Sequence, residues 1–235
     1  MANILMPLPT HDFDVTEVVV PWKVLRDAGH EVVFATPDAQ LAACDPLLLT
    51  GVIFGQLGAN EANVALYEEL QADSAFVAPI SYADIDPQAF DALVLPGGHA
   101  PGMRSYLGSE LLQAKVAAIW AREVPVGAIC HGSLVLARAK DPATGASIVQ
   151  GHAMTCLPWW MEFSAWALTF WKLGRYYRTY ADYVQDEVEG CGALFQRGPL
   201  HSDYGRPFLV ETDRLVTGRW PGDAQAFAEA ILARL

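Results

Sequence analysis

Positive charge is scarce in this sequence. Only 18% of the 235 residues are charged, and 15 Lys and Arg stand against 27 Asp and Glu, which gives a formal net charge of −12. Nucleic-acid binding depends on basic side chains that neutralise phosphates. The composition therefore argues against a nucleic-acid partner. The low share of charge also indicates a surface that is partly neutral or covered by a second subunit.

Cysteines are few and widely separated. The chain has Cys44, Cys130, Cys156 and Cys191, with no CxxC pair and no Cys/His cluster at metal-ligand spacing. This pattern argues against a disulfide framework and against a zinc site. We expect no metal, no organic cofactor and a reducing, cytoplasmic location.

A long apolar run is also missing. The N-terminus has no basic segment followed by an apolar core, and its first residues are typical of an opening strand. The most apolar stretch, 159–171, is interrupted by Glu162, Ser164 and Thr169 and is too short to cross a bilayer. We therefore expect no membrane association.

Apolar segments alternate with helical patterns along the chain. Residues 4–8 and 31–35 are typical of strands, and Thr16 can cap a helix between them that ends at Gly29. A strand, a helix and a strand in that order form a βαβ unit, which implies a parallel sheet. Residues 91–95 predict a further buried strand.

The second half of the chain follows the same plan. Ser109 can cap a helix that leads to a strand at 125–129, and residues 208–210 and 215–217 predict a hairpin. Asp223 can cap a last helix. We expect that helix to bury Phe227, Ala230 and Ile231.

Two stretches interrupt this pattern, and we interpret them as insertions in a single domain that spans 1–235. Residues 44–83 are irregular, with a helix predicted at 60–70, and residues 157–190 are rich in Trp, Phe and Tyr. Helical spacing predicts that Phe163, Trp166 and Phe170 pack as the core of the second insertion. Alternatively, its aromatic residues form a lid over a substrate or an oligomer surface. Arg175, Arg178 and the tyrosines at 176, 177, 180 and 183 line either a pocket or a subunit interface.

The segment 126–132 (VGAICHG) is the strongest candidate for chemistry. A strand stops at Cys130 and a helix starts at once, which predicts a sulfur exposed at the sheet edge, at the positive end of the helix, and readily ionised. His131 can act as its base. Because adjacent helical residues do not face each other, this pairing requires a strained turn like the nucleophile elbow of hydrolases. The alternative is a buried, inert cysteine, which is also what we expect of Cys156.

Two other features follow neighbouring strands. Gly97 and Gly98 end the strand at 91–95 and can offer backbone N–H groups to an oxyanion, although a tight turn is the simpler interpretation. Glu17 lies at the start of the first helix, where it can hydrogen-bond the Cys130 sulfur or interact only with the helix dipole. His11 lies in the preceding loop and is a candidate substrate contact.

Four short motifs, taken together, resemble one protein family. They are 17–21 (EVVVP), 93–99 (LVLPGGH), 128–132 (AICHG) and 215–222 (LVTGRWPG). In this combination the chain resembles the ThiJ/PfpI superfamily, which has the fold of class I glutamine amidotransferases. The resemblance implies an α/β fold: a flavodoxin-like three-layer sandwich with a mostly parallel central sheet and helical insertions.

The resemblance also implies roles for individual residues. Cys130 would be the nucleophile, Glu17 the acid at its sulfur and His131 the base, with the N–H groups of Gly98 and His131 as the oxyanion hole. His99 and the bulky insertions are most similar to the heat-shock chaperone and glyoxalase branch.

That branch has a third acid after the next strand, and Glu162 is the first acid at that place. We assign Glu162 to orienting His131. Gly97, His99 and His11 are expected to contact substrate, and the family implies a homodimer.

These observations favour a cysteine enzyme without a cofactor that acts on a small carbonyl compound. A glutathione-independent glyoxalase and an amide or ester hydrolase would use the same residues. The alternative is a stress-response holding chaperone or an oxidation sensor based on Cys130. A glutaminase-type amidotransferase is less favoured, because His201 lies late in the chain but has no His-x-Glu pattern.

Overall fold

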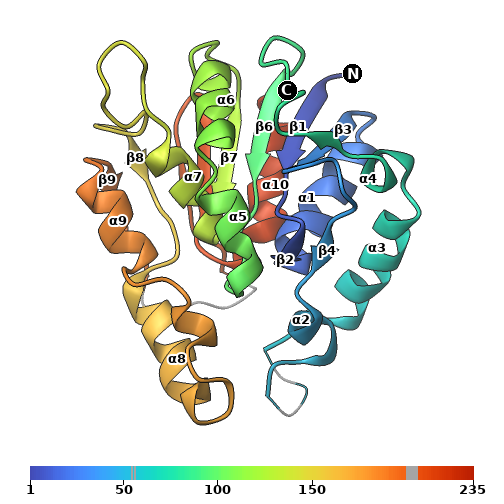
Figure 1. Ribbon diagram of the computed structural model, residues 1–235, viewed down its shortest axis with the longest axis vertical. Helices are drawn as coiled ribbons and strands as arrows, with labels where there is room; N and C mark the ends of the chain where they lie inside the picture. Colours follow the sequence, from blue (N-terminus) through green and yellow to red (C-terminus); the bar gives the residue numbers. More distant parts are fainter. Residues whose placement is uncertain (54, 56, 200–205) are drawn as a thin grey trace.

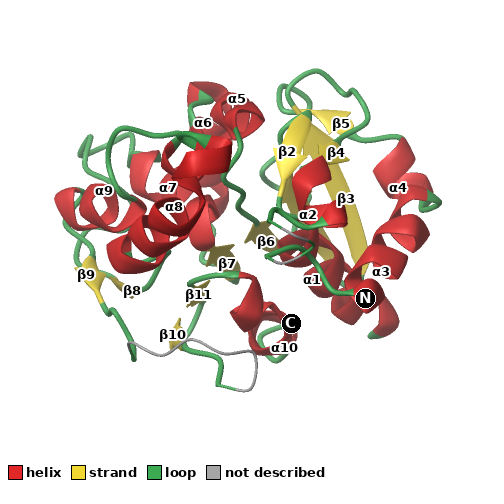
Figure 2. Ribbon diagram, turned by 90° about the horizontal axis from the view of Figure 1, so that it is seen from below, coloured by secondary structure: helices red, strands yellow, loops and turns green. Residues whose placement is uncertain are grey.

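The computed structural model describes residues 1–53, 55, 57–199 and 206–235. In this part of the chain a seven-stranded sheet lies between two layers of helices, with α1 and α10 on one face and α6 and α7 on the other (Figures 1 and 2). The predicted three-layer α/β fold with a mostly parallel sheet is confirmed.

The central sheet has the order β10-β11-β7-β6-β1-β3-β5, and two small sheets pair β2 with β4 and β8 with β9. The strands are β1 Asn3–Pro7, β2 His11–Phe13, β3 Glu31–Thr36, β4 Ala43–Cys44, β5 Ile80–Ser81, β6 Ala92–Leu95, β7 Val126–Ile129, β8 Ala153–Met154, β9 Leu194–Phe195, β10 Leu209–Glu211 and β11 Leu215–Gly218. The α-helices are α1 Val15–Asp27, α2 Pro46–Thr50, α3 Glu61–Gln71, α4 Ser74–Val77, α5 Arg104–Leu107, α6 Glu110–Trp120, α7 Ser133–Arg138, α8 Trp159–Leu173, α9 Val184–Gly190 and α10 Ala224–Leu232. Short 3-10 turns are η1 Pro101–Met103, η2 Cys130–Gly132, η3 Tyr176–Arg178 and η4 Pro221–Asp223.

All central pairings are parallel except β10 with β11. The strands predicted at 4–8, 31–35, 91–95 and 125–129 are confirmed to within one residue at either end as β1, β3, β6 and β7, and the predicted hairpin is β10–β11. Because β1, β6 and β7 are parallel neighbours, their carboxyl ends meet at one edge of the sheet. That edge is where open α/β folds bind ligands.

One predicted helix cap is wrong, and another is confirmed in position only. Asp14, not Thr16, caps α1, since its Oδ1 accepts hydrogen bonds from the N–H groups of Thr16 and Glu17 at 2.9 and 3.2 Å. Asp223 is the N-cap residue of α10 as predicted, but its side chain makes no capping hydrogen bond. Its carboxylate instead pairs with the buried Arg219 at 3.1 Å. In α10, Phe227 and Ile231 are buried as predicted, whereas Ala230 is half-buried.

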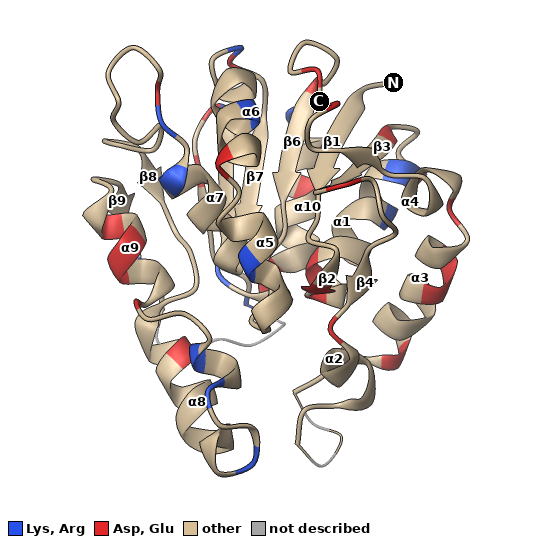
Figure 3. Ribbon diagram, viewed as in Figure 1, with Lys and Arg blue, Asp and Glu red and all other residues tan. Residues whose placement is uncertain are grey.

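The segments interpreted as insertions lie on either side of the sheet edge. The first holds α2, α3 and α4, and the second holds α8, η3 and α9; Figure 1 shows α2 and α8 on opposite sides at the lower end of the molecule. Acidic residues lie on α3 and on α9 (Figure 3). Of the helices described, none is long and apolar enough to cross a membrane.

The predicted core of the second insertion is wrong in part. Phe163 and Phe170 are 43% and 53% exposed, and only Trp166 is packed against the core. The three rings contact one another along α8, with centroids 5.8 and 5.5 Å apart. Their spacing therefore marks a ring cluster on one face of a helix and not a buried interior.

Candidate active site

The predicted residues after β6 and β7 and at the start of α1 lie together. The backbone N–H of Gly97 donates a 2.8 Å hydrogen bond to Oε2 of Glu17. A Cβ atom on Gly97 would lie 3.0 Å from Cβ of Cys130 and 2.7 Å from the backbone nitrogen of His131. Gly97 is thus required because the two strand ends and the helix approach one another too closely for a side chain.

Cys130 occupies a strained turn. Its φ is +56°, in the left-handed region that non-glycine residues seldom adopt. This turn takes Cys130 out of helical geometry, so its Sγ lies 3.4 Å from Nδ1 of the adjacent His131. The strained turn on which the Cys130–His131 pairing depended is therefore present.

The thiol is not exposed or readily ionised, contrary to the sequence-based expectation. Cys130 has no exposed surface. Burial raises the pKa of its thiol well above the ordinary value, and a negative charge on Glu17 raises it further. The hydrogen bond that the His131 backbone N–H makes to the sulfur opposes this shift without reversing it.

Glu17 has an equally unusual environment. Burial raises the pKa of its carboxyl group well above the ordinary value, and the neighbouring Asp14 raises it further. Oε2 accepts from Gly97, whereas Oε1 is buried with no other partner in the described chain and is left for the Cys130 sulfur. Because two adjacent buried anions repel each other, at most one of the two groups is charged. When Cys130 is that group, the O–H of the protonated Glu17 donates to its thiolate.

We expect Glu17→Gln to slow alkylation of Cys130 by iodoacetamide at pH 7 by about tenfold, which corresponds to about one pKa unit. A hydrogen bond to the charged form of a group lowers that group's pKa, and an amide is a weaker donor than a carboxylic acid. The variant thiol should therefore ionise at higher pH. The measurement is the alkylation rate from pH 6 to 10. A faster rate in the variant would contradict the protonated state of Glu17.

The predicted oxyanion donors have different surroundings. In the described part of the chain, the N–H of Gly98 has no hydrogen-bond acceptor, whereas the N–H of His131 is bonded to the Cys130 sulfur. The N–H of Gly97 already donates to Glu17. Gly98 is accordingly the donor that is available to an incoming oxygen.

His131 is neutral in this site. Burial lowers its pKa well below the ordinary value, and nearby His99, Arg138 and Arg178 lower it further. Its ring contacts the rings of His99 and Tyr180, with centroids 5.1 and 5.5 Å away. A neutral imidazole next to the sulfur can accept a proton at pH 7.

The structure does not bring Glu162 to His131. Oε1 of Glu162 accepts a 2.7 Å hydrogen bond from Nη1 of Arg178, and Oε2 accepts from the N–H of Val184 at 3.3 Å. Among the described residues no hydrogen bond joins Glu162 to His131. The predicted contact is therefore wrong, because Arg178 and the start of α9 use both carboxylate oxygens.

The Glu162–Arg178 pair predicts a pH-dependent stability. Burial raises the pKa of Glu162 from 4.5 to about 7, although Arg178 lowers it. Since this pKa is raised in the fold, the buried charge opposes folding increasingly as the pH rises from 4.5 to 7. We expect Arg178→Met to destabilise the protein more at pH 8 than at pH 5, where Glu162 is protonated, with a difference of about 1 kcal/mol. Urea unfolding at both pH values tests this, and an equal loss at both would contradict it.

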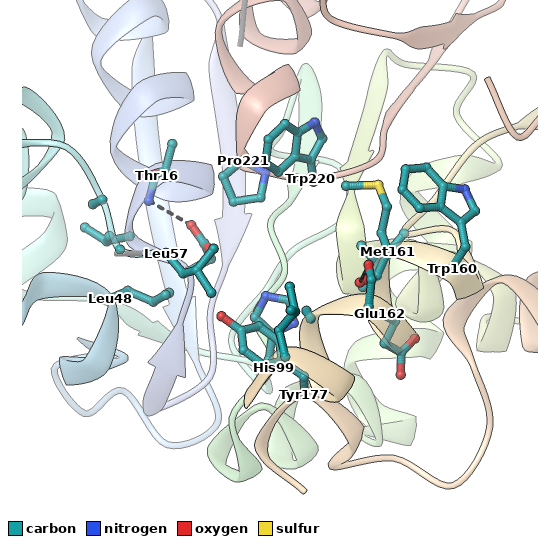
Figure 4. Close-up of a pocket in the computed structure, with 18 of the residues that line it drawn as sticks. Thr16, Leu48, Leu57, His99, Trp160, Met161, Glu162, Tyr177, Trp220 and Pro221 are labelled. Carbon is teal, nitrogen blue, oxygen red and sulfur yellow. Dashed lines mark hydrogen bonds between the residues drawn. The ribbon is translucent and has the colours of Figure 1, made fainter. Parts of the chain in front are cut away.

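A cavity of about 1020 Å³ opens beside the elbow. Figure 4 shows Leu48, Leu57 and Thr16 on one side, Trp160, Met161 and Glu162 on the other, and His99 and Tyr177 between them. Among the described residues, those that line it do not include Cys130. His99 and Tyr177 line the cavity with their rings in contact at 4.8 Å, and the ring of His99 contacts that of His131 at 5.1 Å.

The predicted substrate contacts divide into two groups. His99 lines the cavity, and burial lowers its pKa to about 4, so it is neutral at pH 7. Its Nδ1 is buried with no hydrogen-bond partner in the described chain. Gly97 lies at the elbow. His11 is exposed on β2, which pairs with β4, and it is not among the described lining residues.

Sequence reasoning missed several residues of the site. Asp14 lines the cavity, and burial raises its pKa to about 7. Trp160 and Trp220 were not singled out as cavity residues, although they belong to the aromatic segment and the last motif.

Cys156 is buried, as expected of an inert cysteine, and the described cysteines form no disulfide. His201 lies outside the described residues. Within those residues no cluster of His, Cys, Asp and Glu could hold a metal ion.

Comparisons with known proteins agree with the motifs. A family model described as ThiJ/PfpI family-like matches residues 8–193. An uncharacterised protein of Schizosaccharomyces pombe is 31% identical over 163 residues, which cover 66% of this chain and 58% of that protein. Glyoxalase 3 of Candida albicans is 26% identical over 93% of this chain and 87% of its own length.

Two further similarities extend over the whole chain. Protein/nucleic acid deglycase 2 of Escherichia coli is 25% identical over 100% of this chain and 99% of its own length. The crystal structure of glyoxalase III from Candida albicans superposes with a TM-score of 0.75 at 22% identity, over 100% of this chain and 97% of that one. At this identity the superposition shows a shared fold.

Proposed function

Because the chain belongs to the ThiJ/PfpI family, we propose that it is a glyoxalase-type enzyme that uses Cys130 to convert a 2-oxoaldehyde into a 2-hydroxy acid. The observation that carries the proposal is the elbow itself. Cys130 is held at a φ of +56°, with its sulfur 3.4 Å from a neutral His131. Strain of this kind is retained where it is part of a mechanism.

The reaction begins at the sulfur. The Cys130 thiolate adds to the aldehyde carbon, a C–S bond forms, and the carbonyl oxygen takes up a proton to give a hemithioacetal. The N–H of Gly98 supports the negative charge on that oxygen before it is protonated. Glu17, whose pKa is raised by burial, returns to the carboxylate when its proton leaves.

His131 then moves a proton within the adduct. It removes the proton from the carbon bonded to sulfur and returns it to the neighbouring carbonyl carbon, while the hydroxyl proton of the hemithioacetal moves to the former carbonyl oxygen, which leaves a thioester. Water cleaves the thioester and releases the 2-hydroxy acid and the free thiol. The net change is addition of one water molecule, so neither glutathione nor a redox partner takes part.

The direct test is methylglyoxal without glutathione. We expect lactate to form in proportion to the loss of methylglyoxal, measured with a lactate-specific assay. Methylglyoxal that disappears without lactate would indicate simple adduct formation, and a sample that consumes none would reject the proposal.

A deglycase-type reaction is the second candidate, because the Escherichia coli relative with that name matches this chain over its full length. Hydrolysis of a carbonyl adduct would start with the same C–S bond. An adduct of methylglyoxal with N-acetylarginine distinguishes the two, provided that its decay is compared with the decay of free methylglyoxal. The burial of Cys130 supports the smaller substrate. Amide or ester hydrolysis, a holding chaperone and an oxidation sensor differ from both, since each of them predicts no lactate from methylglyoxal.

The cytoplasmic location and the homodimer are part of the same proposal. Support for a second subunit comes from α8, on which Trp159, Phe163, Phe170 and Trp171 are 42–61% exposed. Sedimentation at several concentrations measures the oligomeric state.

A further inference from the structure

The cavity beside the elbow is larger than a three-carbon dicarbonyl requires. Its volume of about 1020 Å³ is at the upper end of small-molecule sites, which hold roughly 300–1,000 Å³. A small hydrophilic substrate would leave most of this space to water. The volume of the cavity therefore indicates that the substrate carries a larger substituent than a methyl group.

The walls of the cavity are mainly apolar. One is formed by α2 and the segment that follows it, with Leu48, Leu57 and Ala59, and the other by α8, with Trp160, Met161 and Leu168 (Figure 4). Leu57 and Leu168 are 53% and 68% exposed although they line the cavity. An apolar ligand between the walls would remove this surface from water, which favours binding.

The charges in the cavity disfavour an anionic substrate. Asp14 and Glu162 line it, and Arg178 is already paired with Glu162. Arg206, the one cation among the described lining residues, is exposed. A carboxylate or phosphate on the substrate would meet Asp14 and Glu162 inside the cavity, and the exposed Arg206 is the one cation among the described lining residues that could balance it.

We propose that the substrate is an uncharged 2-oxoaldehyde with a bulky apolar substituent of about the size of an aromatic ring. This inference rests on the proposed glyoxalase-type function. The substituent lies between α8 and the wall that contains Leu48, Leu57 and Ala59, and the two carbonyl groups reach past His99 and Tyr177 toward Cys130. The neutral His99 at the inner end offers a polar ring to these carbonyl groups.

The test compares kcat/KM for methylglyoxal, phenylglyoxal and 4-carboxyphenylglyoxal. For the wild type, we expect the value for phenylglyoxal to exceed that for methylglyoxal by at least about tenfold, because burial of a ring contributes that much or more. The carboxylate should remove most of this gain. Rates of adduct formation with N-acetylcysteine correct for the intrinsic reactivity of the three aldehydes.

A variant pair assigns the preference to the cavity. Ala165→Trp, on the α8 wall, should reduce the ratio of phenylglyoxal to methylglyoxal turnover by at least about tenfold, since a second ring occupies the space. Ala167→Trp is the matched control, because Ala167 is two residues away on the same helix and is not a described lining residue. It should keep the wild-type ratio, and melting temperatures show whether each variant is folded.

A second measurement does not depend on turnover. The Cys130 thiolate displaces bromide from phenacyl bromide and forms a C–S bond, and we expect saturation with reagent concentration that Ala165→Trp weakens. Equal turnover of methylglyoxal and phenylglyoxal, without saturation by phenacyl bromide, would overturn the inference and leave the proposed function intact. No turnover of any 2-oxoaldehyde would overturn the proposed function and the inference that rests on it.

Discussion

Replacing Cys130 with alanine is expected to lower turnover of a 2-oxoaldehyde by at least about a thousandfold, as loss of a nucleophile does in other enzymes. Sγ is the atom that forms the covalent bond. Neither of its neighbours, His131 and Glu17, can replace it as the nucleophile. Lactate formation at saturating methylglyoxal measures the effect. Alanine has to adopt the same φ of +56° as cysteine, so the backbone strain is retained.

Cys191→Ala is the matched control for this prediction. Cys191 is a free cysteine that lies at the end of α9 and is half-buried. Its removal tests whether any reactive thiol accounts for the turnover, and we expect it to leave the rate unchanged. If Cys130→Ala keeps more than a tenth of the wild-type rate, the assignment of the nucleophile is wrong.

The sequence predicted the sheet and the elbow because both depend on local pattern. Buried strands are short apolar runs, and β6 is followed by Pro96 and Gly97 and β7 by Cys130, so their carboxyl ends could be placed at one edge. Glu17 and Gly97 follow from this arrangement, since they are next to the ends of parallel neighbours. The 2.8 Å hydrogen bond between them is the product of that topology.

The protonation of the site could not be predicted in the same way. Cys130 is fully buried, and Tyr177, from an aromatic segment more than 40 residues later in the chain, lies close enough for the Cys130 charge to affect its pKa. The pairing of Glu162 with Arg178 likewise depends on how the chain turns after α8. Sequence spacing located the acid, and only the fold of the insertion showed which partner it has.

Substituting Gly132 is expected to have a large effect on stability. A Cβ atom at this position would lie 2.1 Å from the backbone oxygen of Leu95, so η2 or the end of β6 has to move. We expect Gly132→Ala to lower the free energy of unfolding by about 3 kcal/mol. For a chain of this length that corresponds to a decrease of roughly 10 °C in Tm.

The same substitution tests how closely the chemistry depends on backbone position. Gly132 follows the Cys130–His131 pair, so its displacement should also lower turnover under conditions where the variant is folded. Gly190→Ala is the control, because a Cβ atom there meets nothing within 4 Å and the residue is helical. It should be neutral or slightly stabilising. A Gly132→Ala variant as stable as Gly190→Ala would show that the elbow tolerates a side chain and that its contact with β6 is not required.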